Sequence, residues 1–400
     1  MLSETKRREF FHVSLASFLN SIGSNLQLSV WPFFLQLSNV SESTYGLFST
    51  VSSLAGIATR ALGAKLSTRG ESLTLVIGIF TSVCSMMTYA VAPTRVTILV
   101  GMALASISMA LVAMGRTLLI RTVTSPERRA TSYGIVGTLS NAGMVIAANS
   151  GVLMFAVLGY VGLFSLGASI CSLALLFSVA LPRRQALALQ GSLLPLSALR
   201  KSSRALRRFY LVTALDSFSW SVAAPFFSIT AATIFSATKE QIALIQTFMW
   251  GTTIATNIVT ASISDKLHSR KAMLVFSEGL GVVCFALYVA AQSIFPIYLC
   301  AILFGLVVVT WGPIVSAYIT EVTGPGEIHE AIATWMTLTA IARIPGPFIG
   351  GYLAEIWNPK APYLIALPLI VLTAVIIQIS LIEPKRFSRP RHPTSKPAAA

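Results

Sequence analysis

Charged side chains are scarce in this chain, making up 11% of its 400 residues, whereas hydrophobic residues make up 54%. An ordinary soluble domain carries about 25% charged residues, so this sequence lacks the side chains that a water-facing surface requires. Its mean hydropathy of +0.76 instead indicates lipid as the surrounding solvent. We therefore expect a protein embedded in a membrane.

Several chemical sites are also missing. The four cysteines lie in apolar runs without a C-x-x-C spacing, and the four histidines are scattered, which argues against disulfides and zinc. No GxxxxGK[ST] phosphate loop occurs, and the hydrolase patterns GxSxG and HExxH are absent. No soluble segment is large enough to hold an active site. We expect no enzyme, no cofactor and no metal centre.

What the chain does contain is long apolar runs. A helix crosses the hydrocarbon with about 20 apolar residues, and these runs are too long and too uniform for barrel strands. The predicted fold is an all-α integral membrane protein with twelve transmembrane helices in two pseudo-symmetric six-helix bundles. The runs lie near 11–37, 46–65, 73–92, 96–119, 131–157, 159–181, 208–236, 241–263, 272–292, 294–319, 329–354 and 361–382.

The basic residues are distributed unevenly between the two sides of these runs. Of the 29 Lys and Arg residues, only Arg95, Lys239 and Lys360 fall in the loops on one side, while the opposite loops and both termini hold most of the rest. Cytoplasmic loops carry such an excess. We expect a multi-pass protein of the cell membrane with both termini in the cytoplasm. Topology also explains the net charge of +15, so we expect no nucleic-acid partner.

One connection is much longer than the others, and it divides the chain into two halves. We expect residues 1–181 to form the N-terminal bundle, 182–207 a cytoplasmic linker, 208–383 the C-terminal bundle and 384–400 a disordered tail. The halves repeat short segments in the same order: "VTSPERRA" and "VTGPGEIHEA", "PFF" at 32–34 and 225–227, and "LGAKLSTRGES" and "ASISDKLHSRKAM". In the last pair Ser67 stands opposite Asp265. A duplicated six-helix unit is therefore predicted.

These residues resemble the major facilitator superfamily of secondary transporters over nearly the whole chain. The family pattern after the second helix has two glycines, an Asp with a following Arg, and further basic residues. The first half keeps Gly63 and Gly70, but Ser67 and Thr68 stand at the Asp and Arg positions. The second half keeps the charges, as Asp265, Lys266, Arg270 and Lys271.

The resemblance implies that Asp265 helps to hold the cytoplasmic side closed across the two halves. Its partner would be the start of the fifth helix, with Arg121 or Arg129 nearby, because a helix N-terminus stabilises a carboxylate. The alternative is a solvated loop that follows the positive-inside bias. That bias explains the basic residues but not Asp265.

Charges inside membrane helices mark a second candidate region, because a charge there costs at least about 2.5–3.5 kcal/mol. Asp216 in the seventh helix could face substrate and pair with Arg343 in the eleventh. Such a pair would either break when Asp216 takes up a proton, and so couple transport to protons, or be a static buried ion pair. Arg60 and Arg116 would either extend toward the interface or attract an anion to the cavity. Glu278, in a helix that the family places outside the core, is expected to meet a neighbouring helix or lie near the interface.

The family places the first, fourth, seventh and tenth helices around a central cavity. Aromatic and amide side chains on these helices could pack and orient a ligand, although Trp31 could equally anchor the protein at the interface. The candidates are Asn20, Asn25, Gln27, Trp31, Trp220 and Trp311. Pro and Gly residues, including Pro32, Pro225, Pro313 and Pro345, are expected to let these helices bend.

The resemblance implies a secondary transporter that moves a small solute by alternating access. We expect proton coupling, export of amphipathic or anionic compounds, and a monomer in the lipid bilayer. The alternatives are uptake of a nutrient by a uniporter or symporter, a membrane scaffold or receptor that keeps the fold without transport, and a channel.

Overall fold

The computed structural model describes residues 4–67, 69–125, 129–182, 199, 202–267, 269–323 and 328–382. Within these ranges, the side chains of residues 61, 62, 64, 65, 67, 129, 130, 258, 261, 262, 264–267, 313 and 329 are not described. All regular structure in the described ranges is helical. This confirms the predicted all-α fold.

The first half contains helices α1 (Glu4–Gly23), α2 (Trp31–Leu37), α3 (Glu42–Ser67), α4 (Glu71–Val91), α5 (Arg95–Val123) and α6 (Arg129–Val179). Together α1 and α2 make the first membrane span. The helix α6 contains the fifth and sixth spans, which are separated by a kink at Gly159, where φ is +63°. A positive φ is unfavourable for residues with a Cβ atom, so glycine suits this reversal.

The second half contains α8 (Arg204–Ala223), η2 (Ala224–Phe226), α9 (Phe227–Ile234), α10 (Lys239–Leu267), α11 (Arg270–Ala290), α12 (Phe295–Val322), α13 (Ile328–Arg343), α14 (Pro345–Ile356) and α15 (Ala361–Ser380). The seventh span is α8, η2 and α9, and the eleventh is α13 and α14. Their breaks fall at Pro225 and Pro345, as expected. By contrast, α12 runs through Pro313 without interruption.

Seven helical segments of the described chain are long and apolar enough to cross a membrane by themselves. One of them, residues 131–179, contains two spans because the helices merge across Gly159. Two other spans, α1–α2 and α13–α14, fall short because each is broken into two pieces. The helices α3 and α10 are rich in Ser, Thr and Gly, which is consistent with their packing against the other bundle rather than against lipid.

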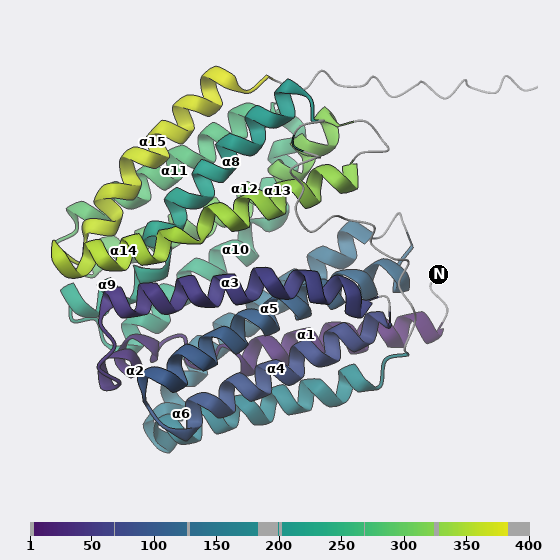
Figure 1. Ribbon diagram of the computed structural model, residues 1–400, viewed down its shortest axis with the longest axis vertical. Helices are drawn as coiled ribbons and strands as arrows, with labels where there is room; N and C mark the ends of the chain where they lie inside the picture. The colour runs from purple at the N-terminus through teal and green to yellow at the C-terminus, as the bar shows by residue number, and fades with distance from the viewer. Residues whose placement is uncertain are drawn as a thin grey trace, which may run out of the picture.

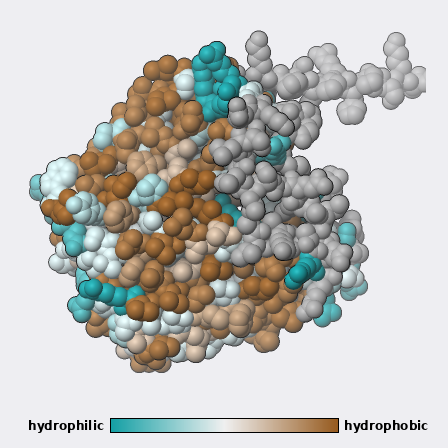
Figure 2. All heavy atoms as spheres, in the orientation of Figure 1, coloured by the Kyte–Doolittle hydropathy of each residue, from teal (hydrophilic) through white to brown (hydrophobic). Residues whose placement is uncertain are grey.

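The two bundles lie side by side, with α3 packed along α14 and α10 along α6 (Figure 1). Among the coloured atoms of Figure 2, hydrophobic side chains form broad areas of the surface. We call the end that carries the start of α1 the basic face, because Arg7, Arg8, Arg121 and Arg204 lie there. The other end, with Arg95, Lys239 and Lys360, is called the opposite face.

Candidate functional site

A cavity of about 300 Å³ lies between the two bundles. Residues of α2, α3 and α4 and of the turn before α2 form its N-terminal side, and residues of η2, α9, α10 and α12 form its C-terminal side. All of its lining residues are uncharged: Gln27, Leu28, Trp31, Tyr45, Tyr89, Ala224, Pro225, Phe227, Ser228, Ile229, Gln246, Met249, Trp250 and Phe304.

Two amide side chains supply the polar character of this cavity. The Gln27 Nε2 donates to the Ser24 carbonyl at 2.9 Å, which leaves its buried Oε1 without a described hydrogen-bond donor. The Gln246 Nε2 donates to Ser228 Oγ at 3.0 Å, and its Oε1 accepts from the Trp250 indole at 3.1 Å. Gln246 is therefore held in place, whereas Gln27, which also lines the cavity, keeps one buried acceptor without a described donor.

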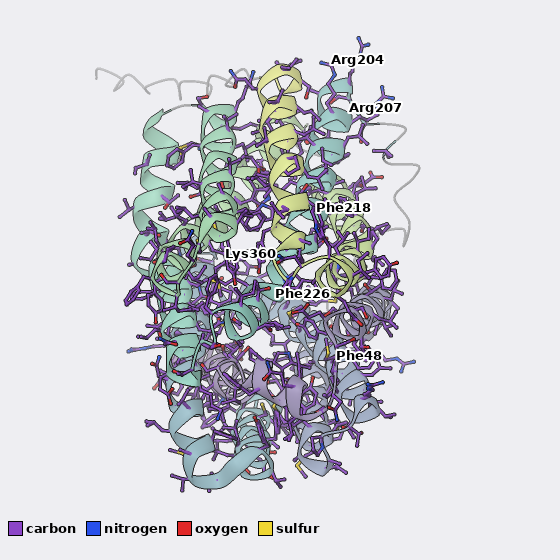
Figure 3. The ribbon with its side chains drawn as sticks, turned by 90° about the vertical axis from the view of Figure 1, so that its left-hand side faces the viewer. Phe48, Arg204, Arg207, Phe218, Phe226 and Lys360 are labelled. Carbon is purple, nitrogen blue, oxygen red and sulfur yellow. The ribbon has the colours of Figure 1, made fainter. Side chains whose placement is uncertain are left out.

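An apolar partition closes the cavity toward the opposite face. Tyr45 and Ile229 line both this cavity and a second one of about 430 Å³ beyond it. The fully buried Phe226 lies 5.7 Å from Tyr45, measured between ring centroids, and belongs to one core cluster with Phe48 and Phe34 of the other bundle. Figure 3 shows Phe226 and Phe48 where the two bundles meet.

Backbone contact between the bundles continues this closure. A Cβ atom at Gly46 of α3 would collide with the Pro347 carbonyl of α14, and one at Gly351 would collide with the Glu42 carbonyl. The Ser43 amide also donates to Glu355 Oε2 at 3.0 Å. We call this contact of α3 with α14 the seam.

Two acidic residues lie at the end of the seam. Burial, and then the nearby Glu355, raise the pKa of Glu42 above its ordinary value. Hydrogen bonds from Ser43 and Ser41 lower the pKa of Glu355. As the pH rises through the raised pKa of Glu42, this carboxyl ionises beside Glu355, so the contact weakens at higher pH.

Contact between α3 and the second bundle is sparser toward the basic face. The helix α13 touches α3 much less than α14 does, and among described residues the hydrogen bond there runs from Arg60 Nη1 to the Met336 carbonyl at 3.3 Å. The described contacts therefore close the protein most firmly toward the opposite face.

The predicted intramembrane charges lie apart from this cavity, inside the bundles and between them. Asp216 is 4% exposed and faces Glu278, which is 1% exposed. The structure gives no ion pair between Asp216 and Arg343 among described residues. Instead, Arg343 is exposed at the end of α13 and acts on Asp216 as a nearby charge. Glu278 meets a neighbouring helix rather than the interface.

The other two predicted arginines have different partners. Arg60 reaches α13, as described above. Arg116 Nη1 donates to Ser140 Oγ at 3.0 Å and so joins α5 to α6 within the N-terminal bundle. Neither side chain lines the cavity between the bundles.

Of the predicted amide and aromatic residues, the structure brings Gln27 and Trp31 to the cavity. Asn25 donates to the Ser21 carbonyl of its own helix at 2.7 Å, and Asn20 is buried with its Oδ1 lacking a described donor. Trp220 packs against Phe285 and against Phe304, which lines the cavity. Trp311 packs against the second core cluster of the C-terminal bundle.

Sequence reasoning missed Gln246 and Trp250. A signal was available, because Gln246 is the one amide in "LIQTFMW" and stands four residues before Trp250, on the same helix face. The eighth span, α10, is not among the helices that the family resemblance places around the cavity, so the sequence did not single out its residues as cavity lining.

The predicted gate is described only in part. Arg270 Nη2 lies 3.0 Å from Glu321 Oε1, so it pairs within its own bundle. Gly63 is buried against Met114, Gly70 precedes α4, and Arg121 is exposed near the end of α5. Lys271 is half-buried at the start of α11. The side chains of Asp265, Lys266 and Arg129 lie outside the described residues, as does Thr68, so the proposed latch stays a prediction.

The family model described as Major Facilitator Superfamily matches residues 13–207 and 209–400. No curated protein matches the sequence significantly.

Solved structures share the fold at low identity. The human organic anion transporter MFSD10 (TETRAN) is 19% identical, with a TM-score of 0.68 over 93% of this chain and 99% of that one. A point mutant of the nucleoside transporter NupG is 14% identical, with a TM-score of 0.77 over 92% and 99%. NupG itself is also 14% identical, with a TM-score of 0.74 over 92% of this chain and 98% of that one.

Proposed function

The chain belongs to the Major Facilitator Superfamily, and we propose that it is a secondary active transporter that moves a small amphipathic solute by alternating access. The family and its structural neighbours are membrane transporters. The two-bundle fold supports a rocking motion about a central site. The closed seam and the sparser contact toward the basic face are consistent with one end of that cycle.

The cavity between the bundles carries the substrate proposal. Its rings Trp31, Trp250 and Phe304 offer flat apolar surfaces, while Gln27 Oε1 offers one acceptor. Uncharged walls do not favour a small ion, and a volume of about 300 Å³ lies at the lower end of the range for small-molecule sites. The proposed substrate is a small solute with a planar apolar part and an N–H or O–H donor.

Flux into proteoliposomes tests this function. Wild-type protein should accelerate saturable exchange of a planar donor-bearing solute, for which a labelled nucleoside is a suitable first probe because NupG is a nucleoside transporter. Gln27→Leu should weaken exchange about tenfold if one hydrogen bond to a neutral ligand is lost. Asn25→Leu is the matched control, because Asn25 bonds to its own helix and does not line the cavity. A scaffold would give no flux for any solute.

A second candidate substrate class is an organic anion, favoured by the arginines. Arg60 and Arg343 are both exposed and close enough to act on each other as like charges. An anion between them would relieve that repulsion. The same liposomes distinguish the classes: Arg60→Gln should reduce flux of an aromatic carboxylate and leave flux of a neutral solute unchanged.

We also propose that the basic face is cytoplasmic in the cell membrane, that residues 182–207 link the bundles there, and that the protein works as a monomer with protons as coupling ion. The basic excess supports the orientation. Cysteines introduced at Glu42 and Lys239 should react with an impermeant thiol reagent outside intact cells. A cysteine at Ser202 should react only after the membrane is opened, and labelling of Ser202 in intact cells would reverse the orientation.

A further inference from the structure

Two buried carboxyl groups of the C-terminal bundle face one another. Asp216 on α8 is 4% exposed, and Glu278 on α11 is 1% exposed. The groups that act on Asp216 are the carboxyl of Glu278, the guanidinium of Arg343 and the indole of Trp220. The group that acts on Glu278 is the carboxyl of Asp216.

The neighbouring residues fix this arrangement. Trp220 lies one turn from Asp216, and its ring fills the space beside Gly281, where a Cβ atom would lie 2.8 Å from Trp220 Cζ2. Since Gly281 lies one turn from Glu278, the same faces of α8 and α11 bring the carboxyl groups together. Asp216 lies about 18 Å from the start of α8, at 1.5 Å per residue. The pair is therefore deep in the membrane.

Hydrogen bonding to the pair is incomplete. Asp216 Oδ1 and both oxygens of Glu278 accept no hydrogen bond from any described donor. Two ionised carboxylates in contact repel each other strongly where water is excluded. A buried acceptor without a donor is also costly. A single proton removes the repulsion and supplies one of the missing donors, because the protonated carboxyl donates to the carboxylate that faces it.

We propose that Asp216 and Glu278 hold one proton between them at neutral pH, so that the pair is a proton-binding site inside the C-terminal bundle. Arg343 of α13 is the basic group that acts on it, and no acid or base on the described parts of α12, α14 or α15 does so. Because Arg343 is exposed between the bundles, a movement of α13 would change the charge that Asp216 experiences. The use of this proton to drive transport rests on the proposed function, whereas the bound proton does not.

Infrared spectroscopy of the purified protein in lipid nanodiscs tests the site without any substrate. Wild-type protein at pH 7 should show the C=O band of a protonated, buried carboxylic acid, shifted by exchange into deuterated water. The double variant Asp216→Asn and Glu278→Gln should lose this band completely. The Arg343→Gln variant should keep this band up to a higher pH than wild-type protein does, because the Arg343 guanidinium favours ionisation of the pair.

Glu71→Gln is the matched control. Glu71 is also a buried carboxyl, at 4% exposure, but it lies in the other bundle and accepts a hydrogen bond from Thr122 Oγ1 at 2.8 Å. The band should persist in this variant. The single variant Glu278→Gln replaces the double variant if the latter folds poorly. It keeps the shape of the side chain and adds an N–H donor beside Asp216, so it too should lose the band.

Absence of the band in wild-type protein at pH 7, or its survival in both Glu278→Gln and the double variant, would overturn the proton site. A band that behaves as expected, in a protein whose flux ignores the pH gradient, would uphold the site and refute proton coupling instead. The two proposals therefore fail in different measurements.

Discussion

In the N-terminal bundle hydroxyl groups join the buried faces of α4 and α5, whereas in the C-terminal bundle two carboxyl groups meet between α8 and α11. Between α4 and α5, Ser82 Oγ lies 2.5 Å from Ser108 Oγ, and Ser85 Oγ donates to the Gly101 carbonyl at 2.8 Å. Between α8 and α11 stand Asp216 and Glu278. Hydroxyl groups satisfy one another at any pH, but a carboxyl pair depends on its proton. The contact between α4 and α5 is therefore independent of pH, whereas the contact between α8 and α11 depends on the protonation of its carboxyl groups.

The largest effect should come from removing one carboxyl of the pair. Asp216→Asn should abolish accumulation driven by a pH gradient and leave solute exchange largely intact. One pH unit supports about a tenfold accumulation for one proton per solute, and this ratio should fall to one. Ser82→Ala in the N-terminal bundle is the comparison, and its accumulation should stay near wild type. Gradient-driven uptake by Asp216→Asn would remove the difference between the bundles.

The two contacts between the bundles also differ, and Gly46 tests that difference. The seam brings backbone atoms of α3 and α14 into close contact, whereas Asn149 Nδ2 of α6 donates to Thr247 Oγ1 of α10 at 2.7 Å. Gly46→Ala should favour seam opening about 5- to 30-fold, for a cost of about 1–2 kcal/mol. Spin labels at Gln36 and Trp357 should report longer distances.

Gly137→Ala is the control for this substitution, because a Cβ atom there meets nothing within 4 Å. Asn149→Ala should act less than Gly46→Ala, since it removes one hydrogen bond without a collision. Equal distances in Gly46→Ala and Gly137→Ala would show that the seam tolerates a methyl group.

A smaller effect is expected where Ser67 and Asp265 stand at equivalent positions of the two halves. If the Asp265 carboxylate latches α10 to the start of α6, Asp265→Asn should favour opening at the basic face. A loss of about 1.4 kcal/mol changes the population ratio tenfold. Spin labels at the ends of the fifth and eighth spans measure this change. Lys271→Gln is the control. Identical distance distributions in wild type and Asp265→Asn would show that Asp265 belongs to a solvated loop and not to a latch.

The smallest effect should come from polar pairs at the basic face. In the first half Thr122 donates to Glu71, and in the second half Arg270 pairs with Glu321 across the equivalent helices. Thr122→Val should lower stability by about 1 kcal/mol, and Arg270→Gln by about 1 kcal/mol or less because Glu321 is partly exposed. Thermal unfolding in detergent measures both. A larger loss in Arg270→Gln would indicate a role beyond its own bundle.

Composition and helix length predicted the twelve spans, because lipid imposes both on each helix separately. The breaks at Pro225 and Pro345 were likewise local. Facing residues were not predictable in the same way. Glu278 was expected to meet a neighbouring helix or lie near the interface, but the identity of its partner, Asp216, depends on how α8 and α11 approach at Gly281. No local pattern encodes that contact. Gln246 was missed for a similar reason, since its position at the cavity depends on packing between bundles.

The reversal at Gly159 has a consequence for how the protein is made. A single residue connects two spans, and the neighbouring Val157 and Val161 are exposed at 79% and 62%. There is no hydrophilic loop to carry across the bilayer during synthesis. We therefore expect the fifth and sixth spans to enter the lipid together as a helical hairpin whose apolar tip stays in the membrane interface.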